Sequence, residues 1–313
     1  MKSEMTEIAS KTLGDSTSYA VYTDKYDPTL LNPMPRALAR TENNITGDEF
    51  DGFDVWHCYE ATFLTDLGHP VSGIMKIIYP ADTKMMIESK SMKLFLNSFD
   101  MCKMGQNVRT SISNYNHAVR QSISECLEDS RVEVNFFRHV DILNESTEIV
   151  DNELLISSEL YDICEHESEY SDINHVYNSE KTDFIEYHKH IHSRDIHLMF
   201  ESLRSRCRHT KQKDTGTAIV RITDSVITKE SIYKQINSMR ETNEFHEFCA
   251  ERLFTHLNTN EKSSVIVALL YTRRGSLDIN PVRYSKKIDN FEYNNYIRDF
   301  LDVNTLTLPS IIQ

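Results

Sequence analysis

One pattern of elements occurs twice along this chain, and this repeat restricts the possible folds more than any other feature. The segment that starts at Ile87 (IESKSMKLFLNSF) aligns with the segment that starts at Ile227 (ITKESIYKQINSM), with Ile, Ser, Asn and Ser in matching places. In each half, strand-like stretches precede this helical segment, and a second helix and a strand follow it. A short match can arise by chance, but the shared order of elements favours a duplicated β-β-α-α-β unit.

The hydrophobic pattern places the elements of both units. We expect strands at 54–65, 71–81, 131–142, 215–225 and 263–275, and helices at 87–101, about 110–128, 229–240 and 244–257. Residues 1–50 look irregular and polar, whereas residues 145–186 contain 13 Asp or Glu and one Lys, which indicates a partly structured connector. We therefore divide the chain into an N-terminal module at 1–142, an acidic connector at 143–199 and a C-terminal module at 200–313.

Composition excludes several classes of function. The 313 residues are enough to bury a core, and the formal net charge of -14 argues against a general binder of nucleic acid or membrane surfaces. Only 8 glycines occur, without a glycine-rich phosphate loop, so we expect no Rossmann or P-loop nucleotide site. The N-terminus lacks an apolar signal segment, and the longest apolar run (265–271) is too short to cross a bilayer. Six scattered cysteines indicate a reduced, cytoplasmic protein.

A basic cluster surrounds one of the six cysteines. In RSRCRHTKQKD, residues 204–214, Cys207 lies among three arginines and two lysines, and Asp214 follows seven residues later. Neighbouring cations stabilise a thiolate, which is the nucleophilic form of cysteine. Cys207 is therefore a candidate nucleophile and Asp214 a candidate proton donor. A surface loop with a chance cysteine is the alternative interpretation.

Two segments that open helices carry candidate binding residues. In NEFHEFC, residues 243–249, His246 and Glu247 fall in the first helical turn, where an ionised carboxylate can accept two N–H bonds from a guanine-like edge. The ordinary preference of Glu for helix starts is the simpler explanation. In ESKS, Glu88 suits a helix start but Lys90 does not, which indicates either an anionic ligand nearby or a solvated lysine.

Two further stretches carry cations or histidines. TRRGSLDINP, residues 272–281, ends a buried strand with two arginines and a glycine, which suits either a phosphate or a solvated hairpin tip. In HKHIH, residues 188–192, alternate histidines would share one face of a strand, as metal ligands might. No carboxylate or thiol is spaced to complete such a site, so we expect no metal.

Together these stretches resemble the NADPH-dependent nitrile reductases of the QueF type, which convert 7-cyano-7-deazaguanine (preQ0) to 7-aminomethyl-7-deazaguanine (preQ1). IESKSMKLFLNSF resembles the signature of that family, and YDPTLLNPMPRALAR (26–40), NEFHEFC and YTRRGSLDINP resemble its longer, bimodular branch. The resemblance covers about 22–142 and about 200–285. It implies the tunnelling fold, an α+β fold with antiparallel sheets packed against helices, here as two tandem modules. It also implies a homodimer that acts on a free base.

The resemblance also implies roles for individual residues. Cys207 would attack the nitrile carbon and form a covalent thioimide, Asp214 would protonate the nitrogen, and two NADPH would complete the reduction. The deazaguanine would be held by residues from both halves, namely Ile87, Glu88, Ser89, His246 and Glu247. NADPH would be held by a second set, namely Ser89, Lys90, Arg274 and Gly275.

This chain departs from the family pattern in the loop after Cys207. The family usually has Gln-Pro-Asp followed by an aromatic residue, whereas this chain has Gln212, Lys213, Asp214 and Thr215. The proline that stiffens the loop and the aromatic residue that packs it are both missing, and a displacement of about 1 Å can lower a rate on the order of a hundredfold. Two alternatives follow. One is a relative that adds ammonia at the thioimide to form an amidine, and the other is a non-catalytic deazaguanine-binding module.

Overall fold

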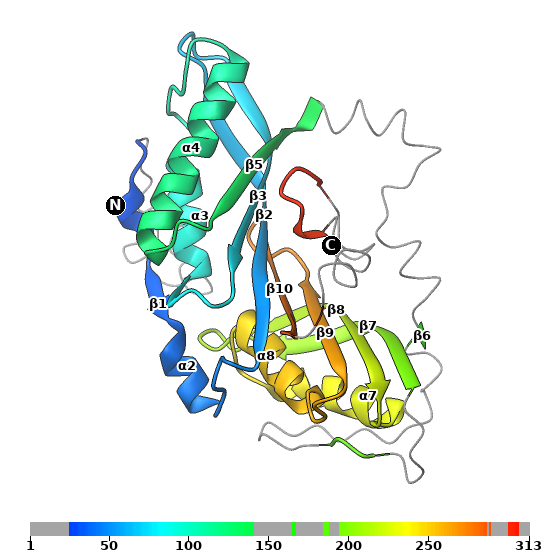
Figure 1. Cartoon of the computed structure of the whole chain (residues 1–313). Coiled ribbons are helices and arrows are strands. Elements are labelled where there is room, and N and C mark those ends of the chain that lie inside the picture. Colours follow the sequence, from blue (N-terminus) through cyan, green and yellow to red (C-terminus); the bar gives the residue numbers. More distant parts are fainter. Residues whose placement is uncertain are drawn as a thin grey trace, which may run out of the picture.

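The N-terminal module is an antiparallel sheet with two helices packed on one face (Figure 1). The computed structural model describes residues 25–140, 165–166, 184–187, 194–286, 288 and 300–306. The main elements of the module are β2 (Phe50–Leu64), β3 (Pro70–Pro80), α3 (Ser89–Asn97), α4 (Val108–Leu127) and β5 (Glu133–Arg138). Before β2 come the 3-10 turn η2 (Pro28–Leu30), β1 (Pro33–Pro35) and α2 (Arg36–Glu42), and β1 pairs with the short strand β4 (Met85–Ile87).

The C-terminal module repeats this order of elements, as the sequence predicts. It contains β7 (Arg194–Arg206), β8 (Lys213–Ser225), α7 (Lys229–Ser238), the 3-10 turn η5 (Met239–Glu241), α8 (His246–Leu257) and β9 (Ser264–Tyr271). The predicted α+β class, with antiparallel strands and a duplicated β-β-α-α-β unit, is therefore confirmed. A further strand, β10 (Leu277–Ser285), follows β9 after a tight turn.

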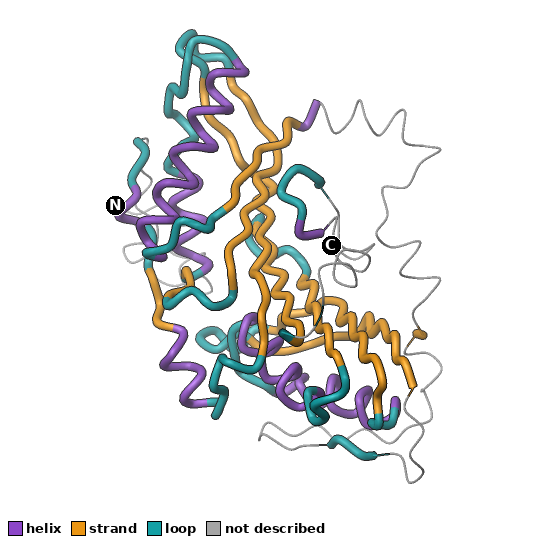
Figure 2. Tube along the Cα trace, viewed as in Figure 1, coloured by secondary structure: helices purple, strands orange, loops and turns teal. Residues whose placement is uncertain are grey.

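Strand β10 joins the two modules into one continuous sheet. It pairs with β9 of its own module and with β2 of the other module, in register from Leu277 opposite Cys58 to Ser285 opposite Phe50. Among the described residues the strand order is β5-β3-β2-β10-β9-β8-β7-β6, and the short strand β6 (Glu165–His166) pairs in parallel with β7. Figure 2 shows these strands as one twisted layer that runs through both modules.

Helices of both modules cover the same face of this sheet. Successive side chains of a strand point to opposite faces, so Trp56 and Cys58 of β2 pack with residues of α3 and α4, while Val55 points to the other side. In the C-terminal module, Val220 of β8 and Val267 of β9 pack against α7 and α8 in the same way. Side chains that leave the strand ends on this face therefore lie beside the first turns of the helices.

Buried charges connect the two modules. Arg36 of α2 and Arg283 of β10 both bind Asp54 of β2, at 2.5 and 2.9 Å, and Arg283 also binds Glu251 of α8 at 3.1 Å. Arg40 of α2 makes a bidentate contact with Glu251, at 2.8 and 2.9 Å. Because each of these two carboxylates binds two arginines, α2, β2, β10 and α8 are held in one arrangement.

Three elements differ from the expectation. The sequence predicts an irregular segment up to residue 50, but α2 forms there and binds α8 and β2 through its arginines. The sequence pattern assigns neither β7, which begins at Arg194 inside the range expected for the connector, nor β10. Strand β10 contains Pro281 and several buried polar residues, among them Asp278, Asn280 and Arg283, which interrupt the apolar pattern expected of a buried strand. The partners of these side chains lie mostly in β2 and α8, where no local pattern reveals them.

Candidate active site

Cys207 opens the loop that connects β7 to β8. Its backbone N–H donates to the carbonyl oxygen of Gln212 at 2.8 Å, and its own carbonyl accepts from Lys211 N–H at 3.0 Å. Ser205 lies directly opposite Asp214 in the β7–β8 ladder. Because alternate residues of a strand share a face, Cys207, two residues after Ser205, starts on the face that carries Asp214. This is the face that α8 covers.

Hydrogen bonds and one arginine favour the thiolate form of Cys207. Burial of this half-buried side chain acts to raise its pKa, but hydrogen bonds from the Thr210 hydroxyl and from the backbone of Thr210 and His209 outweigh it. The positive charge of Arg274 acts in the same direction, so the pKa of Cys207 lies below its usual range. The fraction of reactive thiolate at neutral pH is therefore higher than for an ordinary cysteine.

The arginines next to Cys207 bind acidic partners instead of the thiol. Arg208 contacts Glu244 at 3.3 Å and also binds Glu42 of α2, and Arg206 lies 3.7 Å from Glu241. The basic cluster in the sequence thus fastens the loop to α2 and to the turn before α8. The positive charge that contributes to the lowered pKa of Cys207 comes from Arg274, which lies outside this cluster.

Asp214 is buried and contacts the side chains of Arg274 and His246. Its Oδ1 accepts from Arg274 Nη1 at 3.0 Å, and its Oδ2 lies 3.4 Å from His246 Nε2 at the start of α8. Burial acts to raise the pKa of Asp214, but His246 and Arg274 hold it below its usual range. Asp214 is therefore ionised in this arrangement and must take up a proton before it can donate one.

The first turn of α8 contributes His246 and Glu247, as the sequence predicts. The His246 ring stacks on the ring of Tyr271, with a centroid distance of 3.7 Å and an interplanar angle of 7°. Its Nδ1 is buried and has no hydrogen-bond partner in the described part of the chain. This atom therefore has unused hydrogen-bonding capacity next to Asp214, which suits a polar ligand.

Glu247 is 2% exposed and carries a carboxyl group that titrates near neutral pH. Burial and the negative charge of Asp54 raise the pKa of Glu247 to about 7, against the lowering effect of His246 and Arg36. Strongly shifted carboxyl groups cluster at functional sites, although buried ion-pair networks shift them as well. Glu247 fits both descriptions. It interacts with His246 of the candidate site and with Asp54 and Arg36 of the buried ion-pair network between the modules.

The ESKS motif lies beside α8, although it belongs to the other module. Met86, one residue before the buried Ile87, packs against Phe248 of α8. Glu88 is the N-cap of α3, and its carboxylate accepts from the backbone N–H groups of Lys90 and Ser91 at 3.0 and 2.8 Å. Ser89 begins the helix, and both Ser89 and Lys90 are exposed. The predicted roles of these four residues in ligand binding stay predictions.

The turn between β9 and β10 also reaches the start of α3. Gly275 has a φ of +61°, and a Cβ atom built on it would lie 3.5 Å from Lys93 Nζ. Arg273 lies over the ring of Tyr59 at 4.1 Å, and Tyr59 N–H donates to the carbonyl oxygen of Ser276 at 2.9 Å. The predicted cofactor residues of the two modules therefore lie on neighbouring elements of the same chain.

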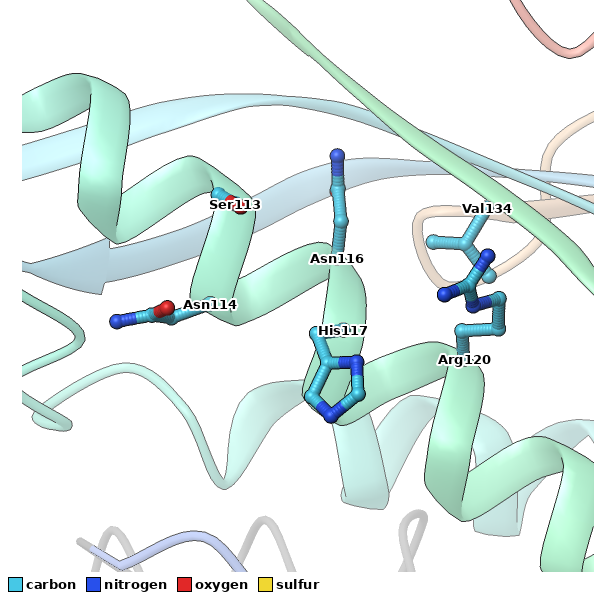
Figure 3. Close-up of a pocket in the computed structure, with 6 residues that line it drawn as sticks. All are labelled: Ser113, Asn114, Asn116, His117, Arg120 and Val134. Atoms are coloured by element: carbon cyan, nitrogen blue, oxygen red, sulfur yellow. The ribbon is translucent and has the colours of Figure 1, made fainter.

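Several features fall outside this group of residues. The HKHIH run, 188–192, lies outside the described residues. Among the residues that are described, no cluster of three or more His, Cys, Asp or Glu side chains is suited to bind a metal, and no helix is long and apolar enough to cross a membrane. A pocket of about 350 Å³ lies along α4 next to β5 (Figure 3), lined by Ser113, Asn114, Asn116, His117, Arg120 and Val134. It contains none of the predicted site residues.

The sequence prediction missed two residues that contact the site. Thr210 donates its hydroxyl to Cys207, and Tyr271 provides the surface on which His246 stacks. A threonine in a polar loop carries no sequence signal. The sequence places Tyr271 at the end of a buried strand, but it does not reveal that the ring of Tyr271 stacks on His246.

Comparison with known proteins concerns the N-terminal module. Residues 22–136 match the family described as nitrile reductase, 7-cyano-7-deazaguanine-reductase N-term (QueF_N). The matched range covers less than half of the chain, so the match describes the N-terminal module alone. It contains β2, β3, α3 and α4 and the ESKS motif, and the architecture of the chain is the tunnelling fold of that family. Cys207 and Asp214 lie outside the matched range, so their roles rest on the geometry of the loop and on the resemblance.

Proposed function

We propose that the protein reduces the nitrile of preQ0 to the aminomethyl group of preQ1 with two NADPH, through a thioimide at Cys207. The observation that carries this proposal is the linked group at the β7–β8 loop. A thiol with a lowered pKa, a carboxylate on the same strand face and a histidine with an unused buried nitrogen occur together. The family of the N-terminal module supports the reaction class.

Cys207 and Asp214 can together carry out the addition to the nitrile without a proton from another source. The Cys207 thiol gives its proton to Asp214 as Sγ bonds to the nitrile carbon, and Asp214 passes that proton to the nitrile nitrogen. A nitrile is thereby converted to a thioimide without net uptake of a proton. Between the two reductions the C–S bond breaks and Cys207 leaves as a thiolate, which the Thr210 and His209 donors stabilise.

Glu247 and His246 would orient the deazaguanine. An ionised Glu247 can accept two N–H bonds from the purine edge, and His246 Nδ1 is available for a third bond. The start of α3 would complete this pocket through Ile87, Glu88 and Ser89, since Met86 packs on Phe248 of α8.

The residues predicted to hold NADPH fit a phosphate-bearing cofactor. Lys93, Lys90 and the turn at Gly275 bring cationic groups and a backbone without a side chain to the start of α3. When bound there, NADPH supplies the two hydrides of the reaction. Arg274 belongs to the same turn, but its guanidinium also binds the loop of Cys207.

The assay that tests this function mixes protein, preQ0 and NADPH and follows absorbance at 340 nm. Oxidation of two NADPH per preQ0, with preQ1 as product, is the expected result. A stable thioimide absorbance without loss of NADPH would instead favour the non-catalytic binding module. Amidine formation with ammonia, independent of NADPH, would favour the amidino-forming relative. We also expect a homodimer of two-module chains, which sedimentation of the full-length protein would test.

A further inference from the structure

The loop that carries Cys207 lacks the stiffening that its family pattern supplies. Lys213 stands where a proline is usual, and Thr215 stands where an aromatic residue is usual. A proline restricts the unfolded and flexible states of a loop, so its absence leaves more conformations to be excluded by other contacts. The loop between Arg206 and Lys213 therefore needs another source of order if Cys207 is to act as a nucleophile.

Arg274 binds two residues of this loop and also Asp214, which follows the loop in β8. Its Nη1 donates to Asp214 Oδ1 at 3.0 Å, its Nη2 donates to Thr210 Oγ1 at 2.9 Å, and the same Nη2 also donates to Gln212 Oε1. The planar guanidinium presents its donors in a fixed fork, so one side chain fixes Thr210, Gln212 and Asp214 relative to each other. Thr210 in turn donates to the Cys207 sulfur. A chain of contacts thus runs from Arg274 to the thiol.

The backbone that carries Arg274 is itself fixed. Arg274 N–H donates to the carbonyl oxygen of Leu277 at 2.8 Å and closes the turn between β9 and β10. Thr272 N–H donates to the carbonyl oxygen of Thr215 at 2.8 Å, and the hydroxyl groups of these two threonines lie 3.0 Å apart. The turn is therefore bonded to β8 directly after Asp214. These hydrogen bonds fix the backbone position from which the Arg274 side chain extends to the loop.

We propose that Arg274 is a positioning residue that orders the Cys207 loop in place of the missing proline and aromatic residue, through Thr210, Gln212 and Asp214. The proposal rests on the proposed function only in taking Cys207 as the nucleophile. It deepens the earlier assignment of Arg274 to the cofactor, since the guanidinium also binds the loop at Thr210 and Gln212 and the adjacent Asp214. Lys90 and Lys93 then provide more of the charge that NADPH requires.

The test measures the pH dependence of alkylation of Cys207 by iodoacetamide in the full-length protein, without preQ0 or NADPH, with peptide mass spectrometry as readout. In Arg274→Gln the alkylation midpoint is expected to rise by about one pH unit, because the Thr210 donor and the nearby charge are both disturbed. Arg274→Lys keeps the charge without the fork and is expected to fall between this variant and the wild type. The matched control Arg273→Gln removes an adjacent charge that faces Tyr59, so its midpoint is expected to stay unchanged.

A second variant keeps the proposal falsifiable if Arg274→Gln does not fold. Thr210→Val removes only the hydroxyl that links the arginine to the thiol, so it should raise the midpoint by itself. When both variants fold, the double variant should shift the midpoint by less than the sum of the single shifts, because both act through one chain of contacts.

Steady-state kinetics separates the loop role from a role in phosphate binding alone. For Arg274→Lys we expect kcat to fall on the order of tenfold or more, with a smaller change in the KM for NADPH. An unchanged alkylation midpoint in Arg274→Gln and Thr210→Val, together with a raised KM and an unchanged kcat, would overturn the proposal. If the midpoint shifts but no variant or wild type reduces preQ0, the loop role stands and the proposed function fails.

Discussion

At the scale of single residues, Glu247 combines a proposed role in substrate binding with a buried position. Burial and the charge of Asp54 raise the pKa of Glu247 to about 7, whereas the pKa of a glutamate in an unfolded chain is about 4.3. Between these two pH values the folded protein holds a proton that the unfolded chain has released. The free energy of unfolding therefore falls as pH rises through this window. The ionised form that costs stability is also the form that can accept two N–H bonds from a purine edge.

Glu247→Gln should separate these two effects. At pH 8 the variant is expected to be more stable than the wild type by about 1–3 kcal/mol, because a buried charge is replaced by a neutral amide. Its affinity for preQ0 should fall on the order of a hundredfold, because the amide accepts fewer hydrogen bonds. Urea unfolding at pH 5 and pH 8 and calorimetric titration with preQ0 measure both changes.

Glu230→Gln is the matched control for this experiment, because Glu230 is exposed in the first turn of α7, the counterpart of the first turn of α8. It should leave both the pH dependence and the affinity unchanged. A Glu247→Gln variant with the same pH dependence of stability as the wild type would contradict the assigned burial effect.

The residues around Cys207 show what a local sequence pattern can predict about a site. The pattern marks Cys207 and Asp214 as a candidate pair, and the structure places Cys207 at the end of β7 and Asp214 at the start of the neighbouring strand β8. It assigns the electrostatic effect to flanking arginines, but Arg208 binds Glu42 and Glu244 instead. Cations that are neighbours in the sequence need not act on the thiol, because carboxylates from distant segments can bind and neutralise them.

At the scale of elements, the start of α3 has a structural role that is independent of any ligand. The Glu88 carboxylate accepts from two backbone N–H groups that the helix leaves without partners. The cap of α4 is a matched case, where Asn107 and Thr110 form a reciprocal capping box. The two caps differ in position, since α3 begins beside α8 and α4 begins in a loop after α3.

Replacing either cap by alanine should cost similar stability but affect binding differently. Glu88→Ala and Asn107→Ala are each expected to lower the free energy of unfolding by about 1 kcal/mol. Only Glu88→Ala should weaken preQ0 binding, if the implied contact with the deazaguanine exists. Urea unfolding and titration with preQ0 provide both numbers. Equal binding by the two variants would remove Glu88 from the substrate site and leave it as a cap.

The helices are the elements that the sequence predicts best. The expected helix at about 110–128 is observed as α4 (Val108–Leu127), and the expected helix at 229–240 as α7 (Lys229–Ser238). Both have apolar residues at helical spacing that enter the core. Strand β10 lacks a regular apolar pattern, because Asp278, Asn280 and Arg283 are buried among its apolar residues. Their hydrogen-bond partners lie mostly in distant elements, so the local sequence does not show why they can be buried.

At the scale of the whole molecule, β10 and the buried charges fix how the modules meet. Arg283 contacts both Asp54 and Glu251, so its side chain links β10 to an element of each module. The candidate site lies where these modules meet, since residues of α8 and of β4 pack together there. A duplicated unit predicts two modules from sequence, but the junction depends on long-range ion pairs that periodicity does not encode.

Arg283→Met should destabilise the protein far more than removal of a surface arginine. The variant leaves two buried carboxylates with fewer partners, and removal of one member of a buried ion pair costs about 3–5 kcal/mol. Arg131→Met is the control, because Arg131 binds Asp82 and Asp129 at an exposed position, where such a pair contributes about 1 kcal/mol or less. Urea unfolding at pH 7 compares them. Similar losses in both variants would show that the junction does not depend on Arg283.

The proposed function depends on a covalent bond between the sulfur of Cys207 and the nitrile carbon of preQ0. Intact-protein mass spectrometry after incubation with preQ0, without NADPH, tests it most directly. We expect a mass increase of one preQ0 per chain, located at Cys207, retained in Cys126→Ala and lost in Cys207→Ala. The absence of an adduct in wild-type protein that binds preQ0, or an adduct that persists in Cys207→Ala, would contradict it.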